Sequence, residues 1–580
     1  MMMKLAMIVC MFALHGAAYG QAGEVRLPDR EFHGDELIPL GTGYARVMCQ
    51  DGEWLTVHSP HESASALGSG AIYVYRKSSS GYEFFQKLEV ANCPRSLGSR
   101  PIHQRGNVII LGSRQFPGGS LVSGWQPGAV FIFEFNGTQW VETTRLDPDP
   151  LHTIQGWSAF PGPICVVNDE TIMVAEMGNQ SQAAQNTWGC VLVYSKGPSG
   201  WSLTQVWTPP SGPAAPGLIR VGLSMATDGQ KVLVGAIPQY TSSACAYVLR
   251  LDTATGQWVW DGTIPLVSFG WDERTATALA IDGDWLAIGS PNDNCNSPGN
   301  LSVGKVRMWH YASGAWTLAQ TLEASDSWAA LYNPFFACFA SDNFGYSIDF
   351  EAGRLIVGAP HMPYYQPIQM PDLIPGAGYC FEYLGGQWVE TARLRCNREY
   401  STDAELMGYS VAVGGSTAIV GSYGGNVGTI NDVGRVDVFY LPMGSEVCAG
   451  QPNSAGNGAK LEVTGFDEAS WGFLRLTALG MPPGEFAMFL AGTAAQATPV
   501  NIPGSQGQLC LGGSLARLSP IGGPADGAGT VRVQLPDLDL PTNPPLTISA
   551  GQTWYFQGWY RDHNPAPTSN FTSAVGVPFR

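Results

Sequence analysis

The sequence predicts an all-β protein, a seven-bladed β-propeller followed by a small C-terminal β-sandwich. Two observations lead to this prediction. Short runs of β-branched and aromatic residues, each bounded by Gly or Pro, recur along most of the chain. No stretch has a sustained apolar period of a helix. The 580 residues include 72 Gly and 41 Pro, with only 13% charged and 11% aromatic residues, which is typical of many short strands joined by tight turns.

The clearest structural unit spans residues 344–394. It contains four strand-like runs, at residues 344–350, 354–360, 376–383 and 387–394, separated by turns and one long loop. A single four-stranded sheet in water cannot bury both of its faces. We therefore expect copies of this unit to stack against one another.

Related units occur seven times along the chain. Gly358 and its counterparts mark the second strand of each unit, at His58, Gly112, Ala175, Gly235, Gly289, Gly358 and Gly421. Repetition of a four-stranded unit is the signature of a propeller. A Trp or Tyr recurs in the fourth strand, and we interpret it as packing between blades. The last unit lacks a fourth strand, so we expect the N-terminal segment, near residues 24–40, to supply the outer strand of blade seven.

The motif residues of the clearest unit resemble a known repeat. Phe344-Gly345 and Gly358-Ala359-Pro360 resemble the FG-GAP repeats of integrin α-subunit propellers, and look still more like the FG-GAP-type proteins that bacteria export. The resemblance covers about residues 24–442. It implies that the long loops share one face of the propeller, and it suggests a role in binding or cell adhesion.

Calcium is the cofactor that this resemblance would suggest. Integrin-type repeats bind it in an Asp-rich loop between strands one and two, but here those joints are short turns such as Asp51-Gly52 and Asp228-Gly229. Such hairpin turns offer too few oxygen ligands. The oxygen cluster Asn292, Asp293 and Asn294 is the remaining candidate, although no bidentate Glu accompanies it. We otherwise expect no cofactor and no metal.

The predicted organisation begins with an export signal at residues 1–20, because Lys4 precedes an apolar run and small residues follow. The propeller then occupies residues 21–442, a linker residues 443–458, and the sandwich residues 459–580. Residues 504–513 resemble a motif in a C-terminal module of exported bacterial repeat proteins. We expect a secreted or surface-held bacterial protein without a membrane span. Export permits disulfides, and our candidate is Cys448–Cys510, which would tie the linker to the sandwich.

Few residues point to chemistry. A net charge of −17 without a basic stripe argues against nucleic-acid binding. The hydrolase motifs Ser-x-x-Lys, Gly-x-Ser-x-Gly and His-Glu-x-x-His are absent. Pairs such as Asp282/Asp284 lie at turns, where aspartates usually cap the backbone. The sequence therefore predicts a protein that is not an enzyme.

Aromatic residues in the predicted loops form the candidate binding face. They could equally pack into small cores of their own. They are Trp125, Trp328, Tyr332, Phe335, Phe336, Tyr364 and Tyr365.

Two hypotheses follow. The first is a secreted, non-catalytic binding or adhesion protein whose loop face meets an extracellular protein or glycan. The alternative is a propeller enzyme that acts on extracellular polysaccharide. Two or more carboxyl groups or histidines converging in the central channel would favour the alternative.

Overall fold

The computed structural model describes most of the chain between its N-terminal segment and its last residue. The described residues are 24–33, 44–60, 70–90, 102–113, 128–147, 160–176, 189–210, 219–238, 244–265, 278–293, 304–326, 343–360, 376–396, 406–424, 434–535, 537–564 and 566–580. In these ranges the regular structure is almost entirely β, and no helix is long and apolar enough to cross a membrane. The expected export signal lies outside the described residues.

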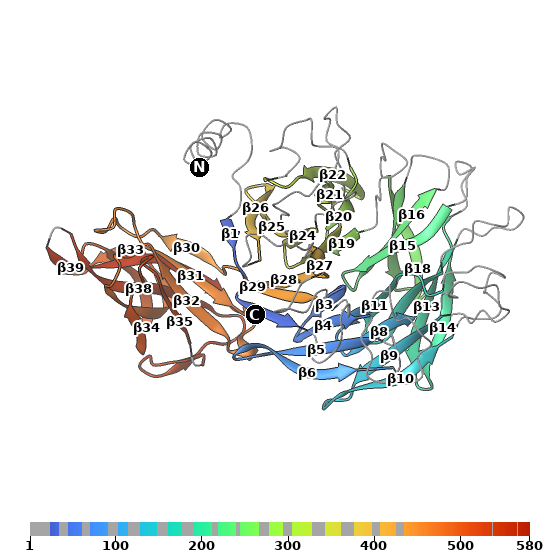
Figure 1. Cartoon of the computed structure of the whole chain (residues 1–580), viewed down its shortest axis with the longest axis horizontal. Helices are drawn as coiled ribbons and strands as arrows, with labels where there is room; N and C mark the ends of the chain where they lie inside the picture. The colour runs from blue at the N-terminus through green and yellow to red at the C-terminus, as the bar shows by residue number, and fades with distance from the viewer. Residues whose placement is uncertain are drawn as a thin grey trace, which may run out of the picture. The chain divides into compact units, whose positions relative to one another are not determined.

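The chain forms two compact units. In Figure 1 most of the first is drawn from blue to orange, and most of the second from orange to red. Unit 2 comprises Arg76–Glu83, Gly415–Thr417 and Tyr440–Arg580, and unit 1 comprises the other described residues. Unit 2 therefore includes three stretches from within the range that we predicted as propeller, namely residues 76–83, 415–417 and 440–442.

Seven sheets follow one another along the described residues between 24 and 440, most of which belong to unit 1. Five sheets consist of four consecutive strands each. Their strands are β3 (Val47–Asp51), β4 (Trp54–Ser59), β5 (Ala71–Ser78), β6 (Gly81–Leu88); β7 (Ile102–Arg105), β8 (Val108–Ser113), β9 (Ala129–Phe135), β10 (Trp140–Leu146); β11 (Ile164–Asn168), β12 (Thr171–Glu176), β13 (Cys190–Gly197), β14 (Gly200–Trp207); β15 (Ile219–Thr227), β16 (Lys231–Pro238), β17 (Cys245–Asp252), β18 (Gln257–Pro265); and β19 (Ala278–Asp282), β20 (Trp285–Ser290), β21 (Lys305–Ala312), β22 (Ala315–Leu322).

The last two sheets of unit 1 each include one N-terminal strand. Their consecutive strands are β23 (Ser347–Glu351), β24 (Arg354–Ala359), β25 (Ala377–Leu384), β26 (Gln387–Leu394); and β27 (Met407–Gly414), β28 (Thr417–Ser422), β29 (Arg435–Tyr440). Strand β2 (Arg30–His33) pairs antiparallel with β29, as the outer strand that the seventh sheet lacks. Strand β1 (Glu24–Arg26) pairs parallel with β26, which we had not expected.

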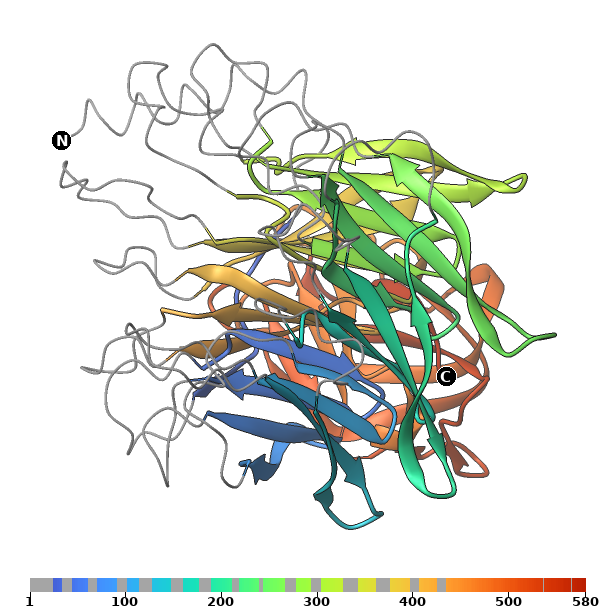
Figure 2. The same ribbon diagram turned by 90° about the vertical axis from the view of Figure 1, so that its right-hand side faces the viewer.

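The first strands of the seven sheets form a closed circuit. Each contacts the first strand of the next sheet, from β3 through β7, β11, β15, β19 and β23 to β27, and β27 contacts β3. Figures 1 and 2 show the same succession of sheets from two directions. This arrangement is of the propeller type.

Hairpin turns join the first and second strands, as the sequence predicts. The backbone φ is positive at Gly52 (55°), Gly229 (89°) and Gly283 (58°), which glycine adopts without a steric penalty. The calcium-type loop of integrin repeats is therefore not present at these joints.

The motif glycines lie where neighbouring sheets approach most closely. A Cβ atom on Gly358 would meet the carbonyl oxygen of Gly408 at 2.1 Å, and one on Gly289 would meet that of Gly345 at 2.1 Å. Backbone thus packs directly on backbone, which only a residue without a side chain permits. This contact explains why the second strand repeats a glycine.

Glutamines in fourth strands join three pairs of sheets. Gln320 of β22 donates to the carbonyl oxygen of Trp388 at 2.9 Å and accepts from its N–H at 2.8 Å. Gln86 makes the same two bonds to Trp140, and Gln205 to Trp258. We call each pair a glutamine latch. The three tryptophans are 2–5% exposed and lie in apolar clusters that span two sheets, as we predicted for packing between blades.

Unit 2 contains two main sheets around one apolar core that includes Trp554, Phe489 and Leu476. The five-stranded sheet has the order β30 (Ser445–Cys448), β39 (Pro567–Pro578), β38 (Thr553–His563), β33 (Phe486–Asn501), β34 (Gln508–Pro524). The smaller elements are β31 (Lys460–Gly465), β32 (Leu474–Leu479) and β35 (Val531–Gln534) in a three-stranded sheet, the pair β36 (Asp539–Leu540) and β37 (Leu546–Thr547), and the 3-10 turn η2 (Ala469–Trp471).

The prediction of a linker at residues 443–458 is wrong. Residues 445–448 form β30, an edge strand paired with β39, and Pro452 bridges to Gly458. Alternating polar and apolar side chains are few here, so the pattern did not reveal a strand. The predicted disulfide joins Cys448 to Cys510. Cys49 and Cys165 are free thiols.

Candidate functional site

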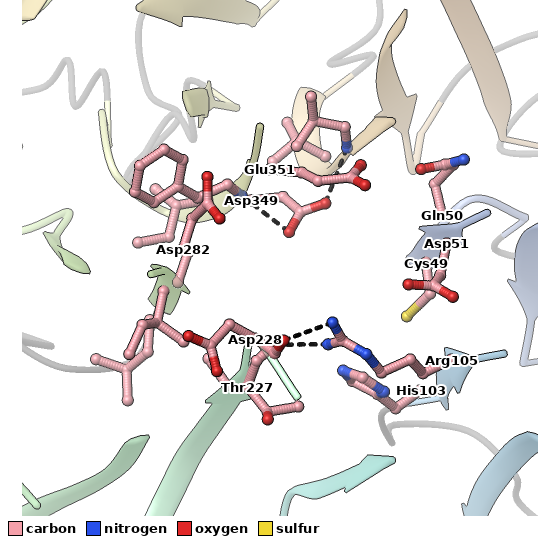
Figure 3. A pocket seen from close by; sticks show the side chains of 18 of the residues that line it. Cys49, Gln50, Asp51, His103, Arg105, Thr227, Asp228, Asp282, Asp349 and Glu351 are labelled. Atoms are coloured by element: carbon pink, nitrogen blue, oxygen red, sulfur yellow. Dashed lines mark hydrogen bonds between the residues drawn. The ribbon is translucent and has the colours of Figure 1, made fainter. Parts of the chain in front are cut away.

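A cavity of about 250 Å³ lies inside unit 1, between the first strands of its sheets. Residues of β3, β7, β15, β19, β23 and β27 line it, so six of the seven sheets contribute. We call it the channel cavity. Figure 3 shows that polar side chains surround its open centre.

Strand register places the polar side chains at equivalent positions. Cys49, His103 and Asp349 each lie two residues before the last residue of a first strand. Each is paired with the third residue of the following strand. The closed circuit of sheets thereby brings together three chemically different groups that are up to 300 residues apart in the sequence.

Asp349 is a carboxyl group that holds its proton unusually well. Burial raises its pKa from 3.8 to about 6, and the negative charge of Asp51 adds to this rise. Hydrogen bonds from the N–H groups of Val413 (2.8 Å) and Phe350 (3.0 Å) oppose it. Near neutral pH, this side chain can both donate and accept a proton.

His103 is a neutral imidazole on the cavity wall. Its Nδ1 accepts a hydrogen bond of 3.2 Å from the N–H of Val166, so the ring proton lies on Nε2. Burial lowers the pKa of His103 to about 4, and the nearby Arg105 contributes to the shift. The side chain can therefore donate a hydrogen bond to a ligand but is a weak base.

Cys49 is poorly suited to act as a nucleophile. Its thiol donates to the carbonyl oxygen of Ile102 at 3.3 Å. Burial raises its pKa to about 12, and the charge of Asp349 adds to the rise. A thiolate, the reactive form, is therefore scarce at physiological pH.

Arg105 extends from β7 to the strand end of β15. Its guanidinium donates to the backbone carbonyl oxygens of Thr227 (3.1 Å) and Asp228 (2.7 Å), as the dashed lines in Figure 3 show. The third sheet lies between these two sheets in the circuit. Arg105 therefore fixes one wall of the channel cavity rather than pairing with its carboxylates.

Two further carboxylates of the cavity hold turns of neighbouring sheets. Asp51 accepts from the N–H of Gly106 at 2.8 Å, and Asp282 accepts from the N–H of Gly353 at 2.9 Å. We had interpreted Asp282 as a solvated turn residue. The structure instead gives it a neighbour across a sheet boundary and a place in the cavity wall.

Several predicted residues lie outside the described part of the chain. They are Trp125, Trp328, Tyr332, Phe335, Phe336, Tyr364, Tyr365 and Asn294. Asp293, from the candidate calcium cluster, is 5% exposed and forms an ion pair with Arg307. No group of three or more metal-type side chains occurs in the described ranges. His58, which we placed in the second strand of the first unit, is fully buried in β4.

No protein-family model matches the chain, and no curated protein matches it. Among solved structures, one from a study titled "Structural and Mechanistic Analysis of Two Prolyl Endopeptidases" is similar with a TM-score of 0.38 at 11% identity. The match covers 78% of this chain and 54% of that one, so the chain spans about half the length of that protein.

Two other similar structures are covered nearly in full. Saccharomyces cerevisiae Sqt1 matches with a TM-score of 0.34 at 10% identity, over 73% of this chain and 100% of that one. A putative 6-phosphogluconolactonase from Bacteroides fragilis matches with a TM-score of 0.32 at 12% identity, over 74% and 91%. At these identities the likeness concerns the fold alone.

The prediction that the protein is not an enzyme is corrected. It is contradicted by the similar structures, which include one from a study of prolyl endopeptidases and two putative 6-phosphogluconolactonases, at 11–12% identity. The prediction depended on catalytic motifs, in which the reacting residues are close together in the sequence. A propeller instead assembles such groups from separate sheets.

Proposed function

We propose that the protein is a secreted enzyme that cleaves an extracellular polysaccharide in the channel cavity. On this proposal, unit 1 is a seven-bladed propeller of the FG-GAP type and unit 2 is a β-sandwich. The motif glycines at sheet contacts support the first assignment. The disulfide Cys448–Cys510 supports export, because disulfides persist in oxidising compartments.

The observation on which the proposal depends is a set of carboxyl groups with unlike environments in one cavity. Asp349 retains a proton up to about pH 6, and Asp51 lies close enough for its charge to affect that proton. Glycosidic bonds are commonly cleaved by such a pair, in which one carboxylic acid protonates the leaving oxygen. The second carboxylate activates water or attacks the sugar.

We assign Asp349 as the general acid and Asp51 as the second carboxylate. His103 donates from Nε2 to a sugar hydroxyl and orients the ring. Arg105 keeps the wall at Thr227 and Asp228 in place and takes no part in proton transfer. The proton that Asp349 gives to the leaving oxygen is restored from water that enters during turnover.

Other reaction types fit the residues less well. Acyl transfer requires an activated nucleophile, and the thiol of Cys49 is held protonated. His103 cannot serve as its base, because Nδ1 accepts from Val166 and the pKa of the ring is low. Carboxyl chemistry remains the best match to this cavity.

The cavity volume limits how much glycan enters. The volume of about 250 Å³ is just below that of common ligand pockets, which range from roughly 300 to 1,000 Å³. We therefore propose attack near a chain end. The rest of the glycan stays outside the cavity, and we propose that the predicted aromatic loop face binds it. An extracellular glycan is thus both the substrate and the partner.

The test is a release assay for reducing sugars with the full-length mature protein and a panel of polysaccharides. We expect cleavage of at least one glycan, and a loss of about 100-fold or more in Asp349→Asn. Asp252→Asn is the matched control, because Asp252 is a turn aspartate that accepts from Ala254 and Thr255 outside the cavity.

Full activity in Asp349→Asn would overturn the assignment of the general acid. Absence of cleavage across neutral, anionic and cationic glycans would overturn the proposed function. Both variants should retain the circular-dichroism spectrum of the wild type, since Asn has nearly the shape of Asp. In Asp349→Asn the single amide oxygen can accept from only one of the N–H groups of Val413 and Phe350.

A further inference from the structure

We infer, on the basis of the proposed function, that Arg105 sets the size of the channel cavity and thereby the length of glycan that enters it. Arg105 is then a specificity-determining residue of the proposed reaction. Three features of the structure support this role. They are the path of the Arg105 side chain past the third sheet, the turn that receives its guanidinium, and the bonds that hold this turn without it.

The path of the Arg105 side chain passes the one sheet that does not reach the cavity. Arg105 ends β7, and its guanidinium donates to Thr227 and Asp228 at the end of β15. Strand β11, which contacts both β7 and β15, lies wholly in the described residues but contributes no lining residue. His103 accepts from the N–H of Val166 in β11, and Figure 3 shows His103 beside Arg105. These two side chains therefore screen β11 from the cavity.

The charge of Arg105 also acts on β11. Cys165 of this strand is fully buried, and burial raises its pKa to about 12. The positive charge of Arg105 opposes this rise, and such an effect weakens with distance. The guanidinium is thus close to sheet three, although its hydrogen bonds go to sheet four.

The turn that follows β15 leaves room for the guanidinium. A Cβ atom on Gly229 would meet Cζ and Nη2 of Arg105 at 3.2 Å and Nε at 3.3 Å. The backbone φ of Gly229 is 89°, which glycine adopts without a steric penalty. A side chain at residue 229 would therefore press on Arg105 and strain the turn.

The same turn is held by bonds of its own. Thr227 Oγ1 donates to the carbonyl oxygen of Lys231 at 2.7 Å and accepts from the N–H of Gly229 at 3.0 Å. The carboxylate of Asp228 accepts from the N–H of Lys231 at 2.7 Å. Without the guanidinium, water can donate to the two carbonyl oxygens. Shortening Arg105 should therefore open space beside β11 rather than collapse the wall.

The size of the cavity determines how far a glycan can enter. In the wild type, about 250 Å³ admits a chain end and limits the products to short sugars. Space in place of the guanidinium would let the chain extend along sheet three. Cleavage would then occur further from the chain end and release longer products.

The first experiment compares crystal structures of the full-length wild type and Arg105→Ala. We expect a larger cavity in the variant, with β11 among its walls. Arg105→Lys should keep nearly the wild-type cavity, because its long side chain still carries a donor for the carbonyl oxygens. Arg105→Gln, with a shorter side chain, replaces the alanine variant if that variant does not fold. An unchanged cavity, or β11 still screened from it, overturns the inference.

The second experiment measures product lengths and kinetics on a polysaccharide that the wild type cleaves, and on its short oligosaccharides. In Arg105→Ala the preference in kcat/KM for long over short substrates should rise about tenfold. The change should lie in KM, since Arg105 takes no part in proton transfer. Arg105→Lys should restore the wild-type preference. Arg250→Ala is the matched control, because Arg250 is half-exposed and pairs with Asp261 outside the cavity.

The two experiments separate this inference from the proposed function. An enlarged cavity with unchanged product lengths and unchanged preference overturns the specificity role, while glycan cleavage still supports the proposed function. Absence of cleavage by the wild type overturns the proposed function and the specificity role. An enlarged cavity in Arg105→Ala would even then support Arg105 as the residue that limits the cavity.

Discussion

The first and the fourth strands of unit 1 hold neighbouring sheets together by different chemistry. At the fourth strands, the amide of Gln320 makes two neutral hydrogen bonds to the backbone of Trp388 beside an apolar cluster. At the first strands, the carboxylates of Asp51, Asp282 and Asp349 accept single N–H groups from the next sheet.

The amide contacts at the fourth strands can only stabilise the fold, whereas the carboxylate contacts at the first strands can also take part in proton transfer. A glutamine latch does not titrate, so it holds the sheets equally well at any pH. A carboxylate that accepts a backbone N–H can still take up or release a proton, so its charge depends on pH. Structural contacts near the channel can therefore also provide acids and bases, whereas those at the fourth strands cannot.

The largest expected effect concerns the fourth strands. Trp388→Ala removes a side chain that is 3% exposed and packs against Phe350 and Trp285. We expect unit 1 to lose about 3–5 kcal/mol of unfolding free energy, as measured by denaturant titration. Trp260→Ala, at a site 49% exposed, should cost far less; equal losses would contradict the assigned packing.

The next effect concerns the charge at the first strands. The folded state holds the Asp349 proton up to about pH 6, against an ordinary value of 3.8. This stabilisation is fully present below about pH 4 and is lost as the pH rises through 6. At about 1.4 kcal/mol for each pH unit, the loss reaches about 3 kcal/mol. Denaturant unfolding of Asp349→Asn, measured at acidic and at neutral pH, should lack this pH-dependent loss of unfolding free energy. An unchanged pH dependence in the variant would exclude the shift.

A smaller effect is expected from breaking one glutamine latch. Gln320→Ala leaves the N–H and carbonyl groups of Trp388 without the side-chain partner, which should cost about 1–3 kcal/mol, with no dependence on pH between acidic and neutral conditions. Gln387→Ala, at an exposed position of β26, is the control. The latch would have no energetic role if both variants unfolded at the same denaturant concentration.

The smallest effect concerns a single carboxylate bond. Asp282→Ala removes the acceptor of the Gly353 N–H, at an expected cost of about 1 kcal/mol. Asp282→Asn keeps an acceptor and should unfold nearly as the wild type does. Thermal unfolding of the two variants distinguishes acceptor from charge, and identical midpoints would show that the bond is energetically silent.

Local features of the fold could be predicted from the sequence. Gly52 and Gly229 indicated hairpin turns because a positive φ excludes most other residues, and Trp140 and Trp388 indicated packing because they recur at one place in the repeat. The parallel strand β1 could not be predicted, since three residues have no distinctive pattern.

The candidate site was missed for a different reason. Cys49, His103 and Asp349 have no shared residue type, and only the register of separate sheets makes them neighbours. An alignment of the residues that precede each hairpin turn would have placed Cys49, His103 and Asp349 at equivalent positions of their strands. Their pKa shifts arise from burial in the assembled channel, which no local pattern reports.

The most direct test of the account is the pH dependence of kcat/KM for glycan cleavage in the wild type and in Asp349→Asn. If Asp349 is the general acid, wild-type kcat/KM falls as the pH rises above about 6, because the free enzyme loses the required proton. The variant should have little activity and lack this alkaline limb. An alkaline limb near pH 6 that persists in Asp349→Asn would contradict the account.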